Sequence, residues 1–467
     1  MTIDINYLTF FNPEWSGKVA SKDNRVSNFK RELFYQVEKK LGGNFIITVS
    51  GVRRVGKSVL CEQLFRKARE SEARESLDQN YHYNFFRFSF DTDEFDLIEA
   101  EYLKELLAFY FNNILKKNPS VLTEPVYIFL DEIQNVRGWP AVIKTFYDLN
   151  KNIKFILTGS SSLYLAEGSE SLAGRVLDYE LGCLSFEEFL SLIAYDFSDD
   201  FDSSSAFIRK VDDLWAIRPR IIPLELSDLF KKFIQIGAFP DTALAMKRGD
   251  DVKEILHFIK SGIVDKIIGR DFRKYFRLEE IAADRKLFAI CGEETGSFYS
   301  LTRLSTETKL SQITVKKHLE IFEKTKLIST ISKFDRKLRR EVSASKKWYL
   351  AHPAIGYALA GRLTTEDTAY LGHAVETYLF NRLKLLSSKI YVELGRGDQE
   401  EVDFYLRDLN LMIESKFTSK IDQRDFKYLR SRSEQLKTHA VVATKNIFER
   451  SNQSDKKDIL FLPAMLF

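Results

Sequence analysis

Residues 51–58 read Gly-Val-Arg-Arg-Val-Gly-Lys-Ser, in which two glycines separated by four residues precede a lysine and a serine. This is the pattern of a phosphate-binding loop, which holds phosphate with backbone amides at the start of a helix and needs a strand before it. Residues 45–50, Phe-Ile-Ile-Thr-Val-Ser, have the character of a buried strand, and residues 59–69 carry apolar side chains at helical spacing. The order of strand, loop and helix favours a phosphate site over a chance glycine turn.

Each residue type in this loop suits one part of a nucleotide bound with Mg²⁺. Gly51 and Gly56 permit backbone angles and a close approach that a Cβ would prevent. Lys57 has the length to reach the β and γ phosphates, and the Ser58 hydroxyl is a suitable ligand for Mg²⁺. The predicted nucleotide contacts are Gly51, Val52, Arg53, Arg54, Val55, Gly56, Lys57, Ser58, Val59 and Thr158.

A second apolar run, residues 126–130, ends in Asp131 and Glu132. Its sequence, Val-Tyr-Ile-Phe-Leu, is typical of a central strand in a parallel sheet. Because ligands bind at the carboxyl ends of such strands, we expect Asp131 to hold the metal and Glu132 to polarise the attacking water. A strand that simply ends at a charged turn is the alternative, and the neighbouring phosphate loop argues against it.

A third strand is predicted at residues 153–157, and Thr158, Gly159 and three serines follow it. These hydroxyls are expected either to sense the γ phosphate or to cap the next helix. Further along, Ala173-Gly174-Arg175 places an arginine after a glycine turn. Arg175 is a candidate phosphate sensor or arginine finger, and a solvated surface arginine is the alternative.

These motifs resemble those of the prokaryotic AAA+ ATPases, and the resemblance is carried by residues 51–58, 129–139, 157–162, 172–175 and 184–189. More narrowly, the chain resembles a subfamily in which the ATPase module precedes a winged helix and a C-terminal domain related to restriction endonucleases. Residues 237–240, Gly-Ala-Phe-Pro, are similar to a Gly-Gly-Phe-Pro segment of that subfamily, with Ala238 in place of the second glycine.

The resemblance implies a P-loop parallel sheet with a helical lid, and ATP and Mg²⁺ as cofactors. It also implies ATP hydrolysis with Lys57, Glu132 and Arg175 in catalytic roles, and Ser58 and Asp131 as the metal ligands. Assembly of a homo-oligomer across the ATP site, or binding of a protein partner, is a further expectation from the resemblance.

The composition is that of a multidomain globular protein. With 467 residues, 44% of them hydrophobic, the chain exceeds the size at which single cores stop growing. No apolar run approaches the roughly 18 residues that a membrane span needs, and the N-terminus does not read as a signal peptide. Three widely spaced cysteines fit reduced thiols, so we expect a cytoplasmic protein.

Basic residues gather between Lys309 and Lys347, although the net charge of the chain is only +3. The pattern predicts a winged helix-turn-helix, with helices at 298–304, 305–312 and 313–325, strands at 327–331 and 348–350, and a wing at 335–341. Val315, Leu319 and Phe322 form the apolar face of the recognition helix. We expect DNA contacts from Thr314, Lys316, Lys317, Arg336, Lys337, Arg339 and Arg340. A protein-packing module with a solvated charged face is the alternative.

The C-terminal part carries acids and a lysine on two predicted hairpin strands, residues 401–406 and 411–416. Glu414 and Lys416 lie two residues apart and therefore share one face of their strand. With Asp403 they resemble the PD-(D/E)XK nuclease core, in which the Asp and the Glu bind Mg²⁺ and the lysine assists the attacking water. The resemblance implies these three as nuclease residues, with Glu376 as the upstream acid. A solvated ion pair is the alternative.

Four domains are expected: an α/β P-loop nucleotide-binding domain (1–195), a helical lid (206–275), a winged helix-turn-helix (276–362) and an α/β restriction-endonuclease-like domain (369–467). The expected function is ATP binding and hydrolysis coupled to DNA binding, with Mg²⁺-dependent DNA cleavage as one output. An ATP-controlled regulatory switch, whose winged helix and inactive nuclease-like domain bind proteins, is the alternative. A third hypothesis is a regulator that binds DNA without cleaving it.

Overall fold

The computed structural model describes residues 3–16, 29–75, 81–91, 98–159, 172–197, 207–217, 222–272, 281–335, 346–395, 400–450 and 459–467. Contacts within the chain divide it into two units. Unit 1 comprises Met1–Gly182 and Arg270–Arg277, and unit 2 comprises Cys183–Gly269 and Leu278–Phe467. Within the described ranges, no helix combines the length and the apolar character that crossing a membrane requires.

Unit 1 is built on a five-stranded sheet in the order β2-β3-β4-β1-β5, and every neighbouring pair is parallel. The strands are β1 (Ile46–Ser50), β2 (Phe85–Ser89), β3 (Val126–Asp131), β4 (Ile153–Thr158) and β5 (Val176–Glu180). The three strands predicted from the sequence are β1, β3 and β4, so the predicted parallel sheet is confirmed. The two edge strands escaped prediction. Arg87 interrupts the apolar sequence of β2, and β5 is partly exposed and not a continuous apolar run.

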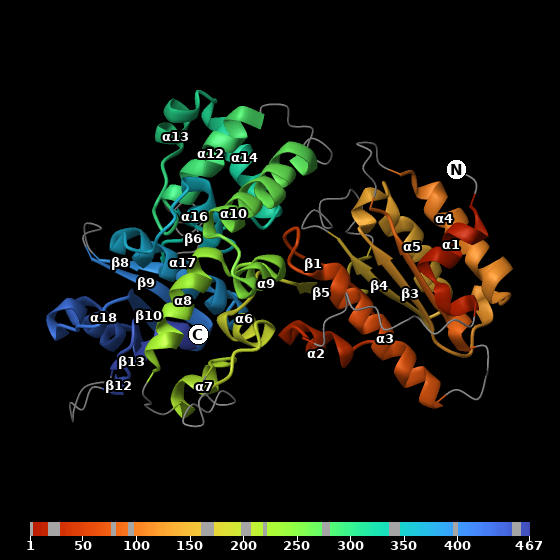
Figure 1. Ribbon diagram of the computed structural model, residues 1–467, viewed down its shortest axis with the longest axis horizontal. Helices are drawn as coiled ribbons and strands as arrows, with labels where there is room; N and C mark the ends of the chain where they lie inside the picture. The colour runs from red at the N-terminus through yellow and green to blue at the C-terminus, as the bar shows by residue number, and fades with distance from the viewer. Residues whose placement is uncertain are drawn as a thin grey trace. The chain divides into compact units, whose positions relative to one another are not determined.

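Helices cover both faces of this sheet (Figure 1). On one face Phe65 packs edge-on against Phe129 of β3. On the other face Ile128 and Leu130 of the same strand join a core cluster with Ile143. Because successive side chains point to opposite faces, a strand covered on both sides is apolar throughout. The helices of unit 1 are α1 (Ile5–Phe11), α2 (Glu32–Glu38), α3 (Lys57–Glu75), α4 (Ala100–Phe109) and α5 (Trp139–Leu149).

Unit 2 begins with a helical region and continues into three helices and a two-stranded antiparallel sheet. The recognition helix predicted at 313–325 is α14, with Val315, Leu319 and Phe322 buried as expected. In place of the two helices predicted at 298–304 and 305–312, the structure has one, which runs without a break from Leu301 to Thr308 and is capped by Ser300. The elements are α6 (Phe186–Leu192), α7 (Val211–Ala216), α8 (Leu224–Ile236), α9 (Pro240–Arg248), α10 (Val252–His257), α12 (Ile281–Glu293), α13 (Leu301–Thr308), α14 (Gln312–Lys324), β6 (Ile328–Ser332), β7 (Lys346–Leu350) and α16 (Pro353–Ala360).

The rest of unit 2 contains a mixed six-stranded sheet in the order β12-β13-β11-β10-β9-β8. Strands β8, β9 and β10 form an antiparallel meander, and β11 then lies parallel to β10. Both predicted hairpin strands are confirmed with their predicted bounds. The elements are α17 (Thr368–Leu386), β8 (Ile390–Leu394), β9 (Glu401–Leu406), β10 (Leu411–Lys416), α18 (Lys427–Leu436), β11 (His439–Thr444), β12 (Glu449–Arg450) and β13 (Ile459–Pro463).

Candidate functional site

The phosphate loop connects the carboxyl end of β1 to the first turn of α3, as the sequence predicts. Gly51 is required by space, since a Cβ built there would lie 2.2 Å from the carbonyl oxygen of Leu181. The buried Lys57 ammonium donates to the carbonyls of Gly51 and Val52, at 3.0 and 3.1 Å. The lysine therefore lies folded over the loop, and the loop lies at the amino end of a 19-residue helix, where backbone amides favour an anion.

Asp131 joins the ends of three elements at this loop. The Ser58 hydroxyl donates to Asp131 Oδ2 at 2.8 Å, and the Thr158 hydroxyl donates to the other carboxylate oxygen. Burial raises the pKa of Asp131, and the neighbouring Glu132 adds to this, whereas the two hydroxyl bonds oppose it. Residues predicted from three separate sequence motifs thus meet at one point, because β1, β3 and β4 are parallel neighbours whose carboxyl ends share an edge.

Glu132 follows in a left-handed backbone conformation with φ 53°, which is uncommon for a non-glycine residue. It borders a small cavity of about 20 Å³ that is also lined by Arg53, Asp91, Gln134, Asn135, Arg270 and Asp271. Arg53 lies 3.6 Å from the carboxylate of Asp271. Burial raises the pKa of Asp271 to about 6, although Arg53 opposes that shift. Arg270 and Asp271 carry no motif in the sequence and were not predicted.

Arg31 supports the loop from outside the motif. Its guanidinium donates to the carbonyl of Val55 at 2.9 Å and to that of Gly182 at 3.0 Å. The residue is only 7% exposed. A buried arginine that bonds a loop carbonyl fixes the loop's backbone, and nothing in the local sequence distinguishes it from a surface arginine.

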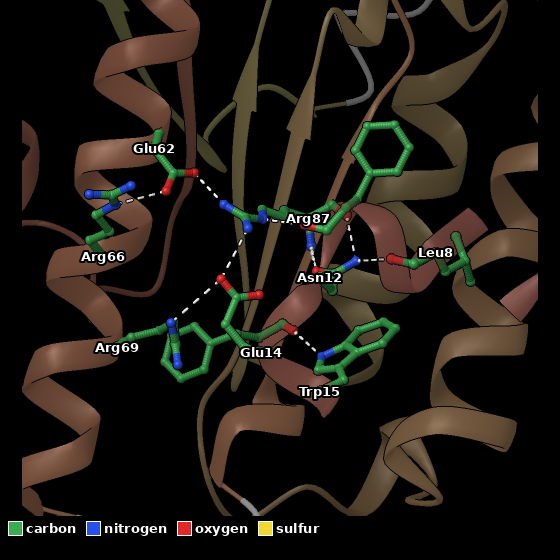
Figure 2. A network of polar contacts seen from close by, with 10 residues as sticks. Leu8, Asn12, Glu14, Trp15, Glu62, Arg66, Arg69 and Arg87 are labelled. Carbon is green, nitrogen blue, oxygen red and sulfur yellow. Dashed lines mark hydrogen bonds and ion pairs between the residues drawn. The ribbon is translucent and has the colours of Figure 1, made fainter. Parts of the chain in front are cut away.

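The start of the chain is tied to the same domain through Arg87 of β2. Figure 2 shows its guanidinium between Glu14 and Glu62, with Arg69 also reaching Glu14. Trp15 adds a bond from its indole to the carbonyl of Phe85, at 3.1 Å. Beside this network lies a cavity of about 260 Å³, whose lining runs from Phe10 and Phe11 of α1 to Ser58 and Asp131.

Arg175 does not reach the site of its own chain, and its role as an arginine finger stays a prediction. Its guanidinium pairs with Asp148, with donor to acceptor distances of 3.0 and 3.3 Å. Its carbonyl accepts from Ile46, the first residue of β1, whereas the phosphate loop follows the last residue of that strand. The glycine turn precedes a parallel strand, so Arg175 lies at the amino edge of the sheet, opposite the loop.

The predicted DNA-contacting residues are partly described. Lys316 and Lys317 are exposed on α14, whereas Thr314 is half-buried and shares a hydrogen bond with the capping Ser311. The predicted wing residues Arg336, Lys337, Arg339 and Arg340 lie outside the described residues. DNA contact by this surface stays a prediction.

The predicted nuclease residues are brought together where β9 and β10 separate. The pairing of these two strands stops at Phe404 of β9 and Ile413 of β10. Beyond it the Ser415 amide donates to Asp403 Oδ2 at 2.7 Å, and the Asp403 amide donates to Glu414 at 3.4 Å. Lys416 lies 3.9 Å from Glu414, so they share a face as expected.

Lys347 of β7 enters this cluster and was not predicted to do so. Its ammonium lies 3.4 Å from Glu376, 2.9 Å from Glu401 and 4.0 Å from Asp403. Lys347 stands at the end of the basic stretch that begins at Lys309, yet it is 3% exposed. Burial raises the pKa of Asp403 to about 8 and also raises that of Glu376, with Lys347 opposing both shifts.

Comparisons with known proteins cover parts of both units. The sequence family described as "AAA domain" matches residues 43–190, and a family described as a domain of unknown function matches residues 227–366. An uncharacterized protein of Haemophilus influenzae is 24% identical over 371 residues, which are 78% of this chain and 80% of that protein. An uncharacterized protein of Methanocaldococcus jannaschii is 27% identical over 329 residues, 68% of this chain and 65% of its own length.

Solved structures give weaker likenesses. The ORC2 protein of Aeropyrum pernix in its ADP form is 11% identical, with a TM-score of 0.33, and the match covers 74% of this chain and 98% of that one. The RuvB Holliday junction branch migration motor of Thermotoga maritima is 14% identical, with a TM-score of 0.30 over 66% of this chain and 91% of its own. Similarities this low support no conclusion about function. The family match and the parallel sheet together identify residues 43–190 as an AAA-type domain with the P-loop ATPase fold.

Proposed function

We propose that unit 1 binds and hydrolyses ATP. The observation that carries the proposal is the meeting of Ser58, Asp131 and Thr158 at the phosphate loop. Lys57 now donates to carbonyls of its own loop and has the length to turn toward the β and γ phosphates of a bound nucleotide. The backbone amides at the start of α3 stabilise the same negative charge.

Magnesium suits the residues beside the loop. A serine hydroxyl and a carboxylate are hard oxygen ligands of the kind that Mg²⁺ prefers, and Ser58 and Asp131 already lie within hydrogen-bond distance of each other. These two residues would hold the ion, which neutralises phosphate charge when bound. Thr158 orients the Asp131 carboxylate through its hydroxyl, so it acts on the site by positioning.

Glu132 is the residue that we assign to the attacking water. Its backbone is left-handed directly after β3, and it borders the small cavity with Arg53 and Arg270. A carboxylate there orients a water and accepts its proton as the oxygen attacks the γ phosphorus. Within one chain, Arg270 is the candidate for stabilising charge on the transferred phosphoryl group, because it lines the same cavity as Glu132.

ATP turnover by two variants tests this assignment. Glu132→Gln keeps the size of the side chain and removes its basicity, so we expect ATP binding to persist and hydrolysis to fall by about 100-fold or more. Lys104→Met is a matched control, since Lys104 is exposed and pairs with Glu101 on its own helix. Hydrolysis by Glu132→Gln at the wild-type rate would refute the role of Glu132.

A second proposal concerns DNA. Lys316 and Lys317 are exposed side by side on α14, and exposed lysines on one helix favour contact with phosphate groups. Replacing both with glutamine should weaken binding of a duplex and reduce its dependence on salt, while Lys309→Gln serves as a control outside the helix. Unchanged affinity in a filter-binding titration would eliminate this surface and favour the regulatory switch.

Mg²⁺-dependent DNA cleavage by the C-terminal sheet is supported by one observation and opposed by another. Asp403, Glu414 and Lys416 converge where two strands separate, as a nuclease core requires. Lys347, however, places an ammonium among the carboxylates.

A further inference from the structure

Lys347 reaches the acidic cluster because of its place on β7. Lys347 and Tyr349 are two residues apart on β7 and therefore share one face of the strand, and both contact Glu376 on α17. The Tyr349 hydroxyl donates to the same Glu376 oxygen at 2.8 Å. Two residues of β7 therefore contact Glu376, and Lys347 also reaches the carboxylates of Glu401 and Asp403 on β9.

The charges in the cluster are arranged around this ammonium. Glu376, Glu401 and Asp403 lie within 4.0 Å of Lys347 Nζ and come from α17 and β9. Burial alone would lower the pKa of Lys347, but the three carboxylates raise it above its usual value. The side chain is therefore a buried cation, and two of its three partners, Glu376 and Asp403, belong to the set that the nuclease resemblance implies.

Carboxylate oxygens suit Mg²⁺, but the arrangement does not. The ion needs several oxygen ligands at about 2.0–2.1 Å in octahedral geometry. Across the ranges that the structure describes, no three His, Cys, Asp or Glu side chains are arranged to hold a metal ion. An ammonium already within 4.0 Å of three carboxylates repels a second cation and occupies part of the space that the second cation's ligands and waters need.

We infer that Lys347 takes the place of a divalent metal in the C-terminal domain, so that the cation of the Glu376, Glu401 and Asp403 cluster is an internal lysine. The domain then holds a nuclease-like set of residues but binds no divalent metal at them. Once the ammonium is removed, the three carboxylate side chains, which are not arranged around a metal ion here, are free to turn toward a divalent cation between them. This inference concerns unit 2 alone and does not depend on ATP hydrolysis.

Mn²⁺ titration of the nucleotide-free full chain, followed by electron paramagnetic resonance, tests it. Wild type and the single variant Asp403→Asn should give the same Mn²⁺-binding isotherm, because Asp403 holds no metal when Lys347 is present. Lys347→Met should gain one Mn²⁺ site bound at least about tenfold more tightly than in wild type. Adding Asp403→Asn to Lys347→Met should abolish that gain. Mn²⁺ bound at Ser58 and Asp131 contributes equally with and without Asp403→Asn, so it does not affect either comparison.

Two controls separate charge from packing. Lys347→Arg keeps a cation and should show no new site, and Lys346→Met changes the neighbouring residue without touching the cluster's ion pairs. If Lys347→Met does not fold, the wild-type pair still decides the question. A Mn²⁺ site in wild type that is lost in Asp403→Asn would overturn the inference, as would Mn²⁺-dependent DNA cleavage that requires Asp403.

Discussion

Replacing Arg31 with methionine should loosen the phosphate loop and weaken ATP binding. The guanidinium donates to Val55 within the loop and to Gly182 just after β5, at 2.9 and 3.0 Å. Methionine has a similar length and no donor, so both carbonyls lose a charge-assisted bond in a buried position. Arg31 is therefore a positioning residue, because it acts on phosphate through the backbone of Val55.

The size of the effect follows from these two bonds. A hydrogen bond with a charged partner contributes about 1.5–3 kcal/mol, so losing two costs about 3–6 kcal/mol of unfolding free energy. One of the two acceptors belongs to the loop, so about half of the loss falls on the conformation that binds phosphate. Because 1.4 kcal/mol corresponds to a tenfold change, ATP affinity should fall by about 10- to 100-fold.

Calorimetry of ATP binding with Mg²⁺, together with thermal unfolding, measures both quantities. Arg66→Met is the matched control, since Arg66 pairs with Glu62 one turn away on its own helix and such pairs contribute about 0.3–0.5 kcal/mol. An Arg31→Met variant that binds ATP with wild-type affinity would refute the reasoning, whatever its thermal stability.

Three further variants test other residues of unit 1. Gly51→Ala should abolish nucleotide binding, because a Cβ would meet the Leu181 carbonyl at 2.2 Å; wild-type binding would show that the loop moves freely. Asp271 has a folded pKa of about 6 against 3.8 when unperturbed, so its stabilising effect is complete below about pH 4 and is lost as the pH rises through 6. Between these pH values the free energy of unfolding of wild type should fall by on the order of 2–3 kcal/mol relative to that of Asp271→Asn. A difference between the two proteins that does not change with pH would contradict the shifted pKa. Arg87→Met should destabilise unit 1 by about 2–4 kcal/mol and reduce hydrogen-exchange protection of residues 3–16, and retained protection would show that the Glu14 and Glu62 contacts do not anchor that segment.

Contacts between residues at the ends of neighbouring parallel strands could be predicted from the sequence. Asp131 and Thr158 end two apolar runs, and parallel neighbours bring such ends to one edge, so their meeting could be expected. The same geometry places Arg175 away from the site of its own chain: it directly precedes β5, and a glycine turn does not reveal at which end of a strand it lies.

Contacts between distant segments could not be predicted. Lys347 stands in a basic stretch of sequence, where a solvated lysine is the usual outcome, and its partners Glu376 and Glu401 lie 29 and 54 residues away. Arg31 and Arg270 likewise show no periodicity or motif, because their roles depend on the packing of segments that a single sequence does not place together.

The most direct test of the central claim is the binding of ATP with Mg²⁺ to wild type and to Lys57→Ala. Lys67→Ala on the same helix, whose lysine pairs with Glu38, controls for loss of a charge from α3. We expect one nucleotide per chain in wild type and in Lys67→Ala, and binding at least about tenfold weaker in Lys57→Ala. Equal affinity in Lys57→Ala and wild type would contradict the assignment of residues 51–58 as the ATP site.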